Sequence, residues 1–244
     1  TSITFGDKTV VTDGSTEGHG SNATFDSTNR TVVVGFKDES NSNYGTGLAY
    51  RVGYSQATGG TIADGKPVIV NANGTVSSVS QSDITQTLGS ATVFESASTK
   101  LTSCTFDSNS NKVVIAYKDN GNSNYGTAVV GTVSGSSISF GTPVIFESAI
   151  SNDIAATFDS SSNKVVIVYS DEGNSGYGNA IIGTVSGTSI SFGSAVIFAL
   201  AETSETSCVF DTSSNKVAIA YRNQDNANYG TAIVGTVSGT SISF

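Results

Sequence analysis

One stretch of sequence recurs four times along this chain and constrains its fold more than any other feature. Each copy contains a Phe-Asp dipeptide, at Phe25, Phe106, Phe158 and Phe210. Successive phenylalanines are 81, 52 and 52 residues apart, so the period is 52 and the first copy carries 29 additional residues. Periods of this size are typical of propellers and solenoids, in which each repeat is one supersecondary unit.

Each copy contains four strand signals, which are clearest in the third copy. The first is Ala155 to Asp159, and the second is Lys164 to Tyr169, whose β-branched centre is typical of a strand covered on both faces. The third, Tyr177 to Val185, leads through a tight turn into the fourth, Ser189 to Phe198. Four strands joined by hairpins predict a propeller blade, because they cannot wind as the single coil of a solenoid.

The connections between copies and the two ends of the chain predict how the blades join. A polar connector such as Glu147 to Ile154 is expected to lead from the outer strand of one blade to the inner strand of the next. Ser2 to Val11 reads as a complete fourth strand, whereas the last copy ends in only the start of one, Ser241 to Phe244. We therefore expect the N-terminal strand to complete the last blade and close a ring, which would leave no open sheet edge.

The predicted fold is thus a single all-β domain over residues 1–244, a β-propeller of four blades with four antiparallel strands each. The insert contains Asn73-Gly74, a type I′ hairpin signal, and is expected to project as a β-hairpin or to contact a neighbouring subunit. Because the chain contains no methionine, we expect Thr1 to follow processing or to begin a fragment. The expected boundaries are blade 1 at about 12–95 with its insert at about 53–87, blade 2 at about 96–146, blade 3 at about 147–198, and blade 4 at about 199–244 with strand 2–11.

Composition narrows the possible partners. The formal net charge is −9 and the chain has only 11 Lys and Arg residues, which argues against nucleic acid because phosphate binding needs clustered positive charge. No apolar run approaches the roughly 18 residues that a membrane-spanning helix requires. We expect neither nucleic-acid binding nor membrane insertion, and leave oligomerisation open.

The cysteines and the histidine give no catalytic signal. Cys104 and Cys208 occupy equivalent positions, where the other copies have Ala23 and Ala156. Small residues at a crowded inner strand account for this pattern, and a disulfide across the molecule is the alternative. The single histidine, His19, lies in a Gly-rich connector with no nucleophile or metal partner in sequence, so we expect a solvated loop residue and no enzymatic activity.

Blade connectivity assigns the loops to two faces. Loops after the second strand share one face with the inter-blade connectors, and that face is expected to be strongly acidic. Its acidic residues are Asp38, Glu39, Asp119, Asp171, Glu172 and Asp225 from loops, and Glu95, Glu147 and Asp153 from connectors. Each loop also contains the pattern Asn-x-x-Tyr-Gly, at Asn41–Gly45, Asn122–Gly126, Asn174–Gly178 and Asn226–Gly230.

Three interpretations of these loops stay open. They form the turns through side-chain to backbone hydrogen bonds, with tyrosines packed between blades; or they bind a glycan or another ligand; or they hold a calcium ion, which needs six to eight oxygen ligands. Recurrence in every copy favours the first interpretation, because a scaffold requirement repeats with the scaffold. The candidate ligand-binding residues are Asp38, Asn41, Tyr44, Asp119, Asn122, Tyr125, Asp171, Asn174, Tyr177, Asp225, Asn226 and Tyr229.

The Phe-Asp turns have a simpler explanation. Asp26, Asp107, Asp159 and Asp211 are each followed by Ser or Thr, a pattern that predicts Asx-type turns. These turns resemble the Asp-box hairpins of sialidases only faintly. The chain has no tryptophan and therefore no Gly-x-Thr-Trp ending, so sialidase chemistry is not inferred.

The repeat itself resembles a known family. Phe106 to Ser148, FDSNSNKVVIAYKDNGNSNYGTAVVGTVSGSSISFGTPVIFES, is similar to the tandem repeats of virion structural and tail-fibre proteins of marine tailed phages. Ala63 to Val76, ADGKPVIVNANGTV, resembles a short β module that accompanies those repeats. The resemblance covers nearly the whole chain and implies a rigid virion or extracellular component that presents loops to a cell surface.

The resemblance leads to a ranked set of functions. The first is a non-enzymatic tail or fibre module for structure or host attachment. Its partners would be a cell-surface glycan or protein receptor, or other virion subunits. The second is a secreted or surface-anchored bacterial adhesin or lectin, and a glycan-processing enzyme is a distant third. The family supplies no catalytic residues and no cofactor for this chain, and calcium remains the one metal to consider.

Overall fold

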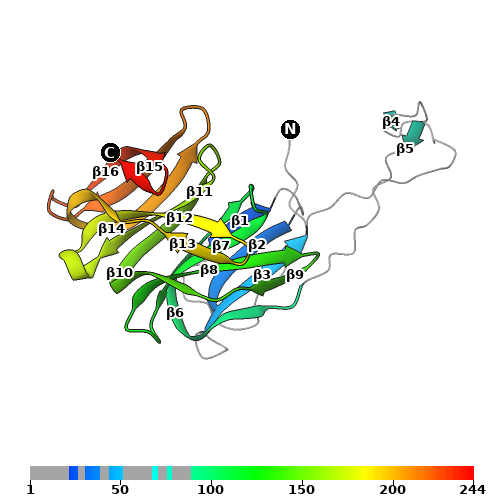
Figure 1. Cartoon of the computed structure of the whole chain (residues 1–244), viewed down its shortest axis with the longest axis horizontal. Helices are drawn as coiled ribbons and strands as arrows, with labels where there is room; N and C mark the ends of the chain where they lie inside the picture. Colours follow the sequence, from blue (N-terminus) through cyan, green and yellow to red (C-terminus); the bar gives the residue numbers. More distant parts are fainter. Residues whose placement is uncertain (1–21, 27–30, 39–43, 52–67, 71–75, 79–88) are drawn as a thin grey trace.

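The structure is a computed structural model that describes residues 22–26, 31–38, 44–51, 68–70, 76–78 and 89–244 (Figure 1). Side chains are described for 23–25, 32–34 and 89–244. The first half of the described chain contains β1 (Asn22–Asp26), β2 (Thr31–Asp38), β3 (Tyr44–Arg51), β4 (Val68–Val70), β5 (Val76–Ser78), β6 (Thr92–Asp107), β7 (Lys112–Asp119), β8 (Tyr125–Ser134) and β9 (Ser137–Phe140). The second half contains β10 (Val144–Asp159), β11 (Lys164–Asp171), the 3-10 turn η2 (Glu172–Asn174), β12 (Tyr177–Ser186), β13 (Ser189–Phe192), β14 (Val196–Asp211), β15 (Lys216–Asn223), β16 (Tyr229–Ser238) and β17 (Ser241–Ser243).

The fold is all-β, as the sequence predicts. Fifteen strands form one large antiparallel sheet in the order β1-β2-β3-β6-β7-β8-β10-β11-β12-β14-β15-β16-β17, with β9 on β8 and β13 on β12. The strands β4 and β5 pair with each other as a separate two-stranded sheet inside the insert. Along the chain the sheet folds into successive repeat units, which Figure 1 shows from β1 and β2 in blue to β15 and β16 in orange and red.

The second strands of the second and third units, β7 and β11, are covered on both faces because each lies between two neighbouring units. In β7, Val113, Ile115 and Tyr117 pack toward Val33 and Phe94 of the preceding unit. The alternate residues Val114 and Ala116 belong to the next cluster, with Val165, Ile167 and Tyr169 of the following unit. The continuous β-branched run therefore buries apolar side chains on both sides of one strand, as expected for a strand inside a stack.

The predicted connectors do lead from the outer strand of one unit to the inner strand of the next, but the chain does not leave the sheet between them. Residues 147–154 lie inside β10, a single 16-residue strand whose first half pairs with β8 and whose second half pairs with β11. The register shifts between Asn152 and Ala155, and Asp153 adopts φ 49°. Leu101 and Glu205, the equivalent residues of β6 and β14, both have φ 53°. The segment is polar because the strand changes partner at a bulge near the surface. In the sequence, such a polar segment is indistinguishable from a loop.

The predicted fourth strand, residues 189–198, is interrupted. β13 ends at Phe192 and β14 begins at Val196, although both pair with β12. Between them, the Gly193 amide donates to the carbonyl of Ile182 at 3.0 Å. A Cβ on Gly193 would collide with the backbone carbonyl of Thr240 in the next unit, so the close approach of the two units requires glycine here.

A phenylalanine is wedged between each pair of successive units. Phe146 lies over Gly126 of the unit before it, where an added Cβ would be 2.5 Å from its Cζ atom. On its other side, its ring centroid is 5.2 Å from Tyr169 and 5.8 Å from Phe192 of the next unit. Phe94 and Phe198 make the matching ring contacts with Tyr117 and Tyr221 at 5.2 Å each.

The repeat units follow one another as a stack, and within the described residues this stack does not close into a ring. No strand pairing joins β16 or β17 to β1, β2 or β3. The outer face of the last unit is correspondingly bare: Val234 is 56% exposed, whereas the equivalent Val130 and Ile182 are fully buried. At the other end of the stack, Phe25 is 48% exposed. The predicted N-terminal strand, residues 2–11, lies outside the described residues.

Both cysteines lie in the described part of the chain, and no disulfide joins them, so that alternative is wrong. The Cys104 thiol is buried and donates a long hydrogen bond to the carbonyl of Val33, 3.9 Å away in the neighbouring unit. Among the described residues, none of the helical segments has the length and apolar character needed to cross a membrane.

Candidate functional site

The Asn-x-x-Tyr-Gly loops of the second and fourth units are type I′ turns. In the second unit, the Tyr125 amide donates to the carbonyl of Asn122 at 3.0 Å, and the two residues between them, Ser123 and Asn124, have φ 56° and 63°. The fourth unit repeats this geometry from Asn226 to Tyr229, with a 3.0 Å hydrogen bond. A type I′ turn needs positive φ at both central positions, which explains the small residue followed by Asn or Gly in each copy.

In the second, third and fourth units, an acceptor at the end of the second strand holds the loop. Asp119 Oδ1 accepts from the Gly121 and Asn122 amides at 2.9 and 3.1 Å, and Asp171 Oδ1 accepts from Gly173 at 2.9 Å. In the last unit the equivalent acceptor is Asn223, whose Oδ1 accepts from the Asn226 amide at 3.1 Å. Asp225 instead lies further into its loop and accepts from the Glu202 amide of β14 at 3.3 Å.

Two of the acidic residues on this side are bonded to buried tyrosines. The Tyr117 hydroxyl donates to Glu95 at 3.2 Å, and the Tyr169 hydroxyl donates to Glu147 at 3.0 Å. Burial, and then the charge of the neighbouring carboxylate, raises the pKa of both tyrosines. Glu95 and Glu147 therefore already accept hydrogen bonds from buried side chains of the protein.

Burial also affects the loop aspartate of the second unit. Asp119 is 6% exposed. Burial, followed by the charge of Glu95, raises the pKa of this carboxyl above its usual range, although the amides of Gly121 and Asn122 act in the opposite direction. The buried carboxylate of Asp119 thus accepts hydrogen bonds that hold its own loop, and its position gives no indication of a ligand.

The candidate residues that reach solvent are the asparagines at the turn tips and, in the last unit, Asp225 and Tyr229. Asn122, Asn174 and Asn226 are exposed, Tyr125 and Tyr177 are half-buried, and Tyr229 is 62% exposed at the open end of the stack. In the first unit, Asn41 lies outside the described residues, and only the backbone of Asp38 and Tyr44 is described.

A chain of polar contacts joins neighbouring loops. Lys118 Nζ donates to Asn152 Oδ1 at 2.7 Å, and Asn152 Nδ2 donates to Glu172 Oε1 at 2.7 Å, which connects the second and third units. The structure thus brings the loops of successive units into one row along the same end of the strands. Within the described part of the chain, no group of three or more His, Cys, Asp or Glu residues could hold a metal ion. His19 lies outside the described residues.

In the last three units, the turns at the opposite end are Asx turns, as predicted, whereas the turn after Asp26 lies outside the described residues. Asp159 Oδ1 accepts from the Ser161 and Ser162 amides at 2.8 and 3.1 Å, and Oδ2 accepts from the Ser162 hydroxyl at 2.6 Å. Asp107 and Asp211 form matching bonds with the serines that follow them. Burial raises the pKa of Asp159, but these hydrogen bonds outweigh it and the net pKa is lowered.

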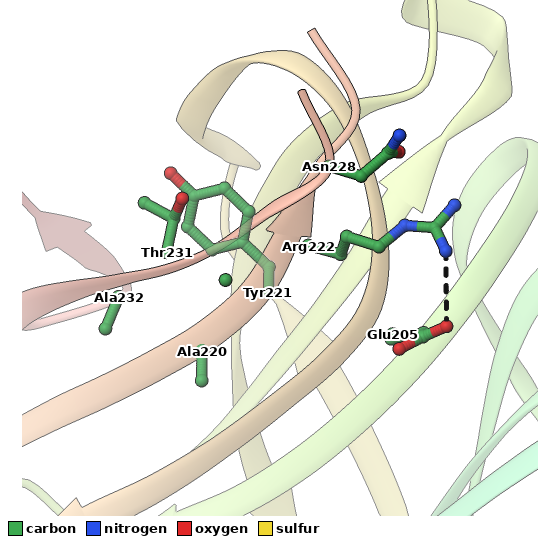
Figure 2. Close-up of a pocket in the computed structure, with 8 residues that line it drawn as sticks. Glu205, Ala220, Tyr221, Arg222, Asn228, Thr231 and Ala232 are labelled. Carbon is green, nitrogen blue, oxygen red and sulfur yellow. Dashed lines mark ion pairs between the residues drawn. The ribbon is translucent and has the colours of Figure 1, made fainter. Parts of the chain in front are cut away.

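Sequence reasoning missed a concavity on the outer face of the last unit (Figure 2). It has a volume of about 510 Å³, and Ala220, Asn228, Gly230 and Ala232 contribute to its lining. Arg222 lies at its rim, with a guanidinium nitrogen 3.5 Å from a Glu205 carboxylate oxygen. Gly230 occupies the position that Gly126 and Gly178 have in the two preceding units.

Comparisons with known proteins do not assign this chain to a family. No family model matches the chain, and no curated protein matches it. Among solved structures, Trypanosoma rangeli sialidase in complex with the inhibitor DANA is similar with a TM-score of 0.41 and 13% sequence identity, over 89% of this chain. The chain spans 36% of the length of that sialidase. A likeness of this size assigns neither a site nor an activity.

Proposed function

We propose that this chain is a non-enzymatic module of the virion or tail-fibre type, with a structural or host-attachment role. It would present its repeated Asn-containing turns to a glycan or protein receptor on a cell surface, or to other virion subunits. The observation that supports this proposal is the row of exposed asparagines, Asn122, Asn174 and Asn226, on turns held by the same kind of acceptor in each of the last three units. Identical tips at a fixed repeat suit a ligand that itself repeats, because several weak contacts then add up to avidity.

We also infer the finer architecture of the module. Four repeat units would form a closed propeller of four blades, with the N-terminal strand completing the last one. The bare outer face of the last unit and the exposed Phe25 of the first unit support this arrangement, because each carries apolar surface of the kind that is buried between the other units.

A binding experiment tests the attachment role. The triple variant Asn122→Ala, Asn174→Ala and Asn226→Ala removes the tip side chains, while the turn hydrogen bonds described above involve only their backbone groups. The matched control, Ser136→Ala, Thr188→Ala and Thr240→Ala, changes the hairpin turns at the opposite end of the strands. We expect the tip variant to lose at least about tenfold in binding to a glycan array or to cells, as avidity over several sites implies. Equal binding by the two variants, or no binding by the unaltered chain, would reject the receptor-binding role.

The second candidate, a bacterial surface adhesin or lectin, makes the same use of the tips but differs in where the protein is found. Antibodies against the chain would label assembled virions in the first case and cell surfaces in the second. Labelling of virions by immuno-electron microscopy supports the first proposal. Turnover of a glycan, abolished by a single carboxylate substitution, would replace both candidates with an enzyme.

A further inference from the structure

A lysine, an asparagine and a glutamate meet at the junction between the second and third units. Lys118 lies on β7, Asn152 on β10 and Glu172 at the start of η2. Lys118 Nζ donates to Asn152 Oδ1 at 2.7 Å, and the Nδ2 atom of the same asparagine donates to Glu172 Oε1 at 2.7 Å. The amine of one unit thus touches the carboxamide of the next unit, and that carboxamide touches a carboxylate. We call these three residues the Lys118 triad.

Strand pairing fixes the backbone on both sides of this contact. Lys118 is paired with Lys100 of β6 and with Gly126 of β8, so its strand is held at both edges. Asn152 is paired with Ser170 of β11, directly before the bulge at which β10 changes partner. Because neither backbone segment is free to move away, the two side chains are kept within reach of each other.

The Lys118 triad does not repeat with the scaffold. At the junction of the first and second units, the position of Asn152 is taken by Lys100, whose side chain has no carbonyl group. At the junction of the third and fourth units, the positions of Lys118 and Asn152 are taken by Ser170 and Ser204. The other junctions therefore form without these groups, so the stacking of units does not explain why the three residues lie together.

The lysine of the triad has the environment of a nucleophile. Lys118 is half-buried, and burial, followed by the charge of Lys100, lowers the pKa of its ammonium group, although Glu172 and Asp153 act in the opposite direction. An amine attacks a carbonyl carbon in its neutral form, so a lowered pKa increases the reactive fraction. Asn152 Cγ is one C=O bond, about 1.23 Å, beyond the Oδ1 atom that accepts from Nζ at 2.7 Å, so the amine nitrogen lies within about 3.9 Å of that carbon. Reacting atoms in near-attack geometry are about 3–3.5 Å apart, so a small side-chain movement is sufficient.

We propose that Lys118 and Asn152 join in a covalent isopeptide bond between the second and third units, with Glu172 as the catalytic residue. The Nζ–Cγ bond forms, the Cγ–Nδ2 bond breaks, and Nδ2 leaves as ammonia. On attack, the amine passes a proton to Glu172, which returns it to the Nδ2 atom that it already contacts, as a positioned acid–base group can do. The proton that the lysine ammonium releases before attack is taken up by the ammonia. The products are thus an uncharged amide and one ammonium ion, and no further reactant is consumed.

Contact between the groups compensates for the low reactivity of a carboxamide toward an amine. Well-oriented groups in one molecule react as if their concentration were about 10⁵–10⁸ M. The half-buried positions of Lys118 and Asn152 also limit access of water, which would otherwise hydrolyse the asparagine to aspartate. The inference rests on the Lys118 triad alone and does not depend on the attachment role proposed above.

Thermal unfolding tests whether the bond joins the two units. It would link residues 34 positions apart, and a cross-link over that length restricts the unfolded chain. Lys118→Arg keeps the positive charge but cannot be deprotonated, so this variant cannot form the bond. We expect it to melt roughly 5–15 °C below the unaltered chain. The matched control, Lys100→Arg on the neighbouring strand, should change the melting temperature by less than about 2 °C. Equal melting temperatures for the two variants would contradict a covalent link.

Mass spectrometry of the unaltered chain tests the bond itself. We expect an intact mass lower than that of the sequence by one ammonia molecule, and a branched peptide that joins Lys118 to Asn152 after proteolysis. Lys118→Arg and Asn152→Ala should have their full masses, whereas Lys100→Arg should still form the cross-link. Glu172→Gln should form it at least about a hundredfold more slowly, because positioned acid–base groups contribute roughly 10²–10⁴ in rate.

Two results would overturn the proposal. The first is the full sequence mass in the unaltered chain after incubation for weeks at neutral pH, with no branched peptide. The second is a loss of ammonia that persists in Lys118→Arg, because it would show that an asparagine has cyclised onto its own backbone. The first result needs no variant, so it does not depend on how a variant folds. Neither measurement involves receptor binding, so failure of the bond and failure of the attachment role are separate results.

Discussion

Removing one wedge phenylalanine is expected to weaken the stack more than removing its neighbour on the same strand. Phe146 is 7% exposed and lies between Gly126 and the rings of Tyr169 and Phe192. Buried Phe→Ala substitutions cost about 3–5 kcal/mol, and each aromatic contact contributes about 0.5–1.5 kcal/mol. Because Gly126 has no side chain that could move into the space, we expect Phe146→Ala to cost about 4–5 kcal/mol of unfolding free energy.

Urea unfolding followed by circular dichroism measures this cost by linear extrapolation. The matched control is Ile145→Ala, one residue earlier on β10, because Ile145 is 45% exposed and should lose only about 1 kcal/mol. The two variants change the same strand and differ in the face that they alter. Equal losses for both variants, or a loss below about 2 kcal/mol for Phe146→Ala, would refute the wedge as the main contact between units.

Two further predictions concern the carboxylates. Hydrogen bonds from Ser213 and Ser214 hold the pKa of Asp211 at about 2. Because this folded value lies below the unfolded one, the stability that Asp211 contributes is present above about pH 4 and is lost as the pH falls through about 2. A carbon-13 NMR titration midpoint near 4 would contradict this. Asp119→Asn is expected to leave stability at pH 7 unchanged or higher, because it removes a buried charge near Glu95 and keeps the acceptor that Asn223 provides in the last unit. A clear loss in urea unfolding would show that the loop needs the carboxylate.

The parts of the fold that repeat could be predicted from the sequence. The 52-residue period, the β-branched run of the second strand and the Asx turns each follow from local pattern, and the structure has them. The long strands could not be predicted, because residues such as Glu147 and Asn152 are polar where β10 changes partner at a bulge. Polarity alone does not distinguish a bulged surface strand from a loop.

The candidate site could likewise be predicted from the sequence only in part. The turn geometry of Asn122 to Tyr125 follows from the preference of Asn and Gly for positive φ. That Asp119 is buried and bonded to loop amides, whereas Asn122 is exposed, depends on packing between units and is not visible in one repeat. The concavity around Gly230 could not be predicted, because it depends on packing: the equivalent Gly126 lies under the ring of Phe146, whereas a Cβ on Gly230 would meet no described atom within 4 Å.

Hydrogen exchange at the edge of β16 tests the central claim, a closed ring of four units, most directly. Peptides covering 229–234 and 177–182 report on equivalent segments, and the second of these has partner strands on both sides. A closed ring predicts comparable protection of the two segments, and faster exchange at 229–234 when Val11→Asp disrupts the proposed N-terminal strand, residues 2–11. Rapid exchange at 229–234 in the unaltered chain, at the rate of an unpaired edge and unchanged by Val11→Asp, would contradict the ring.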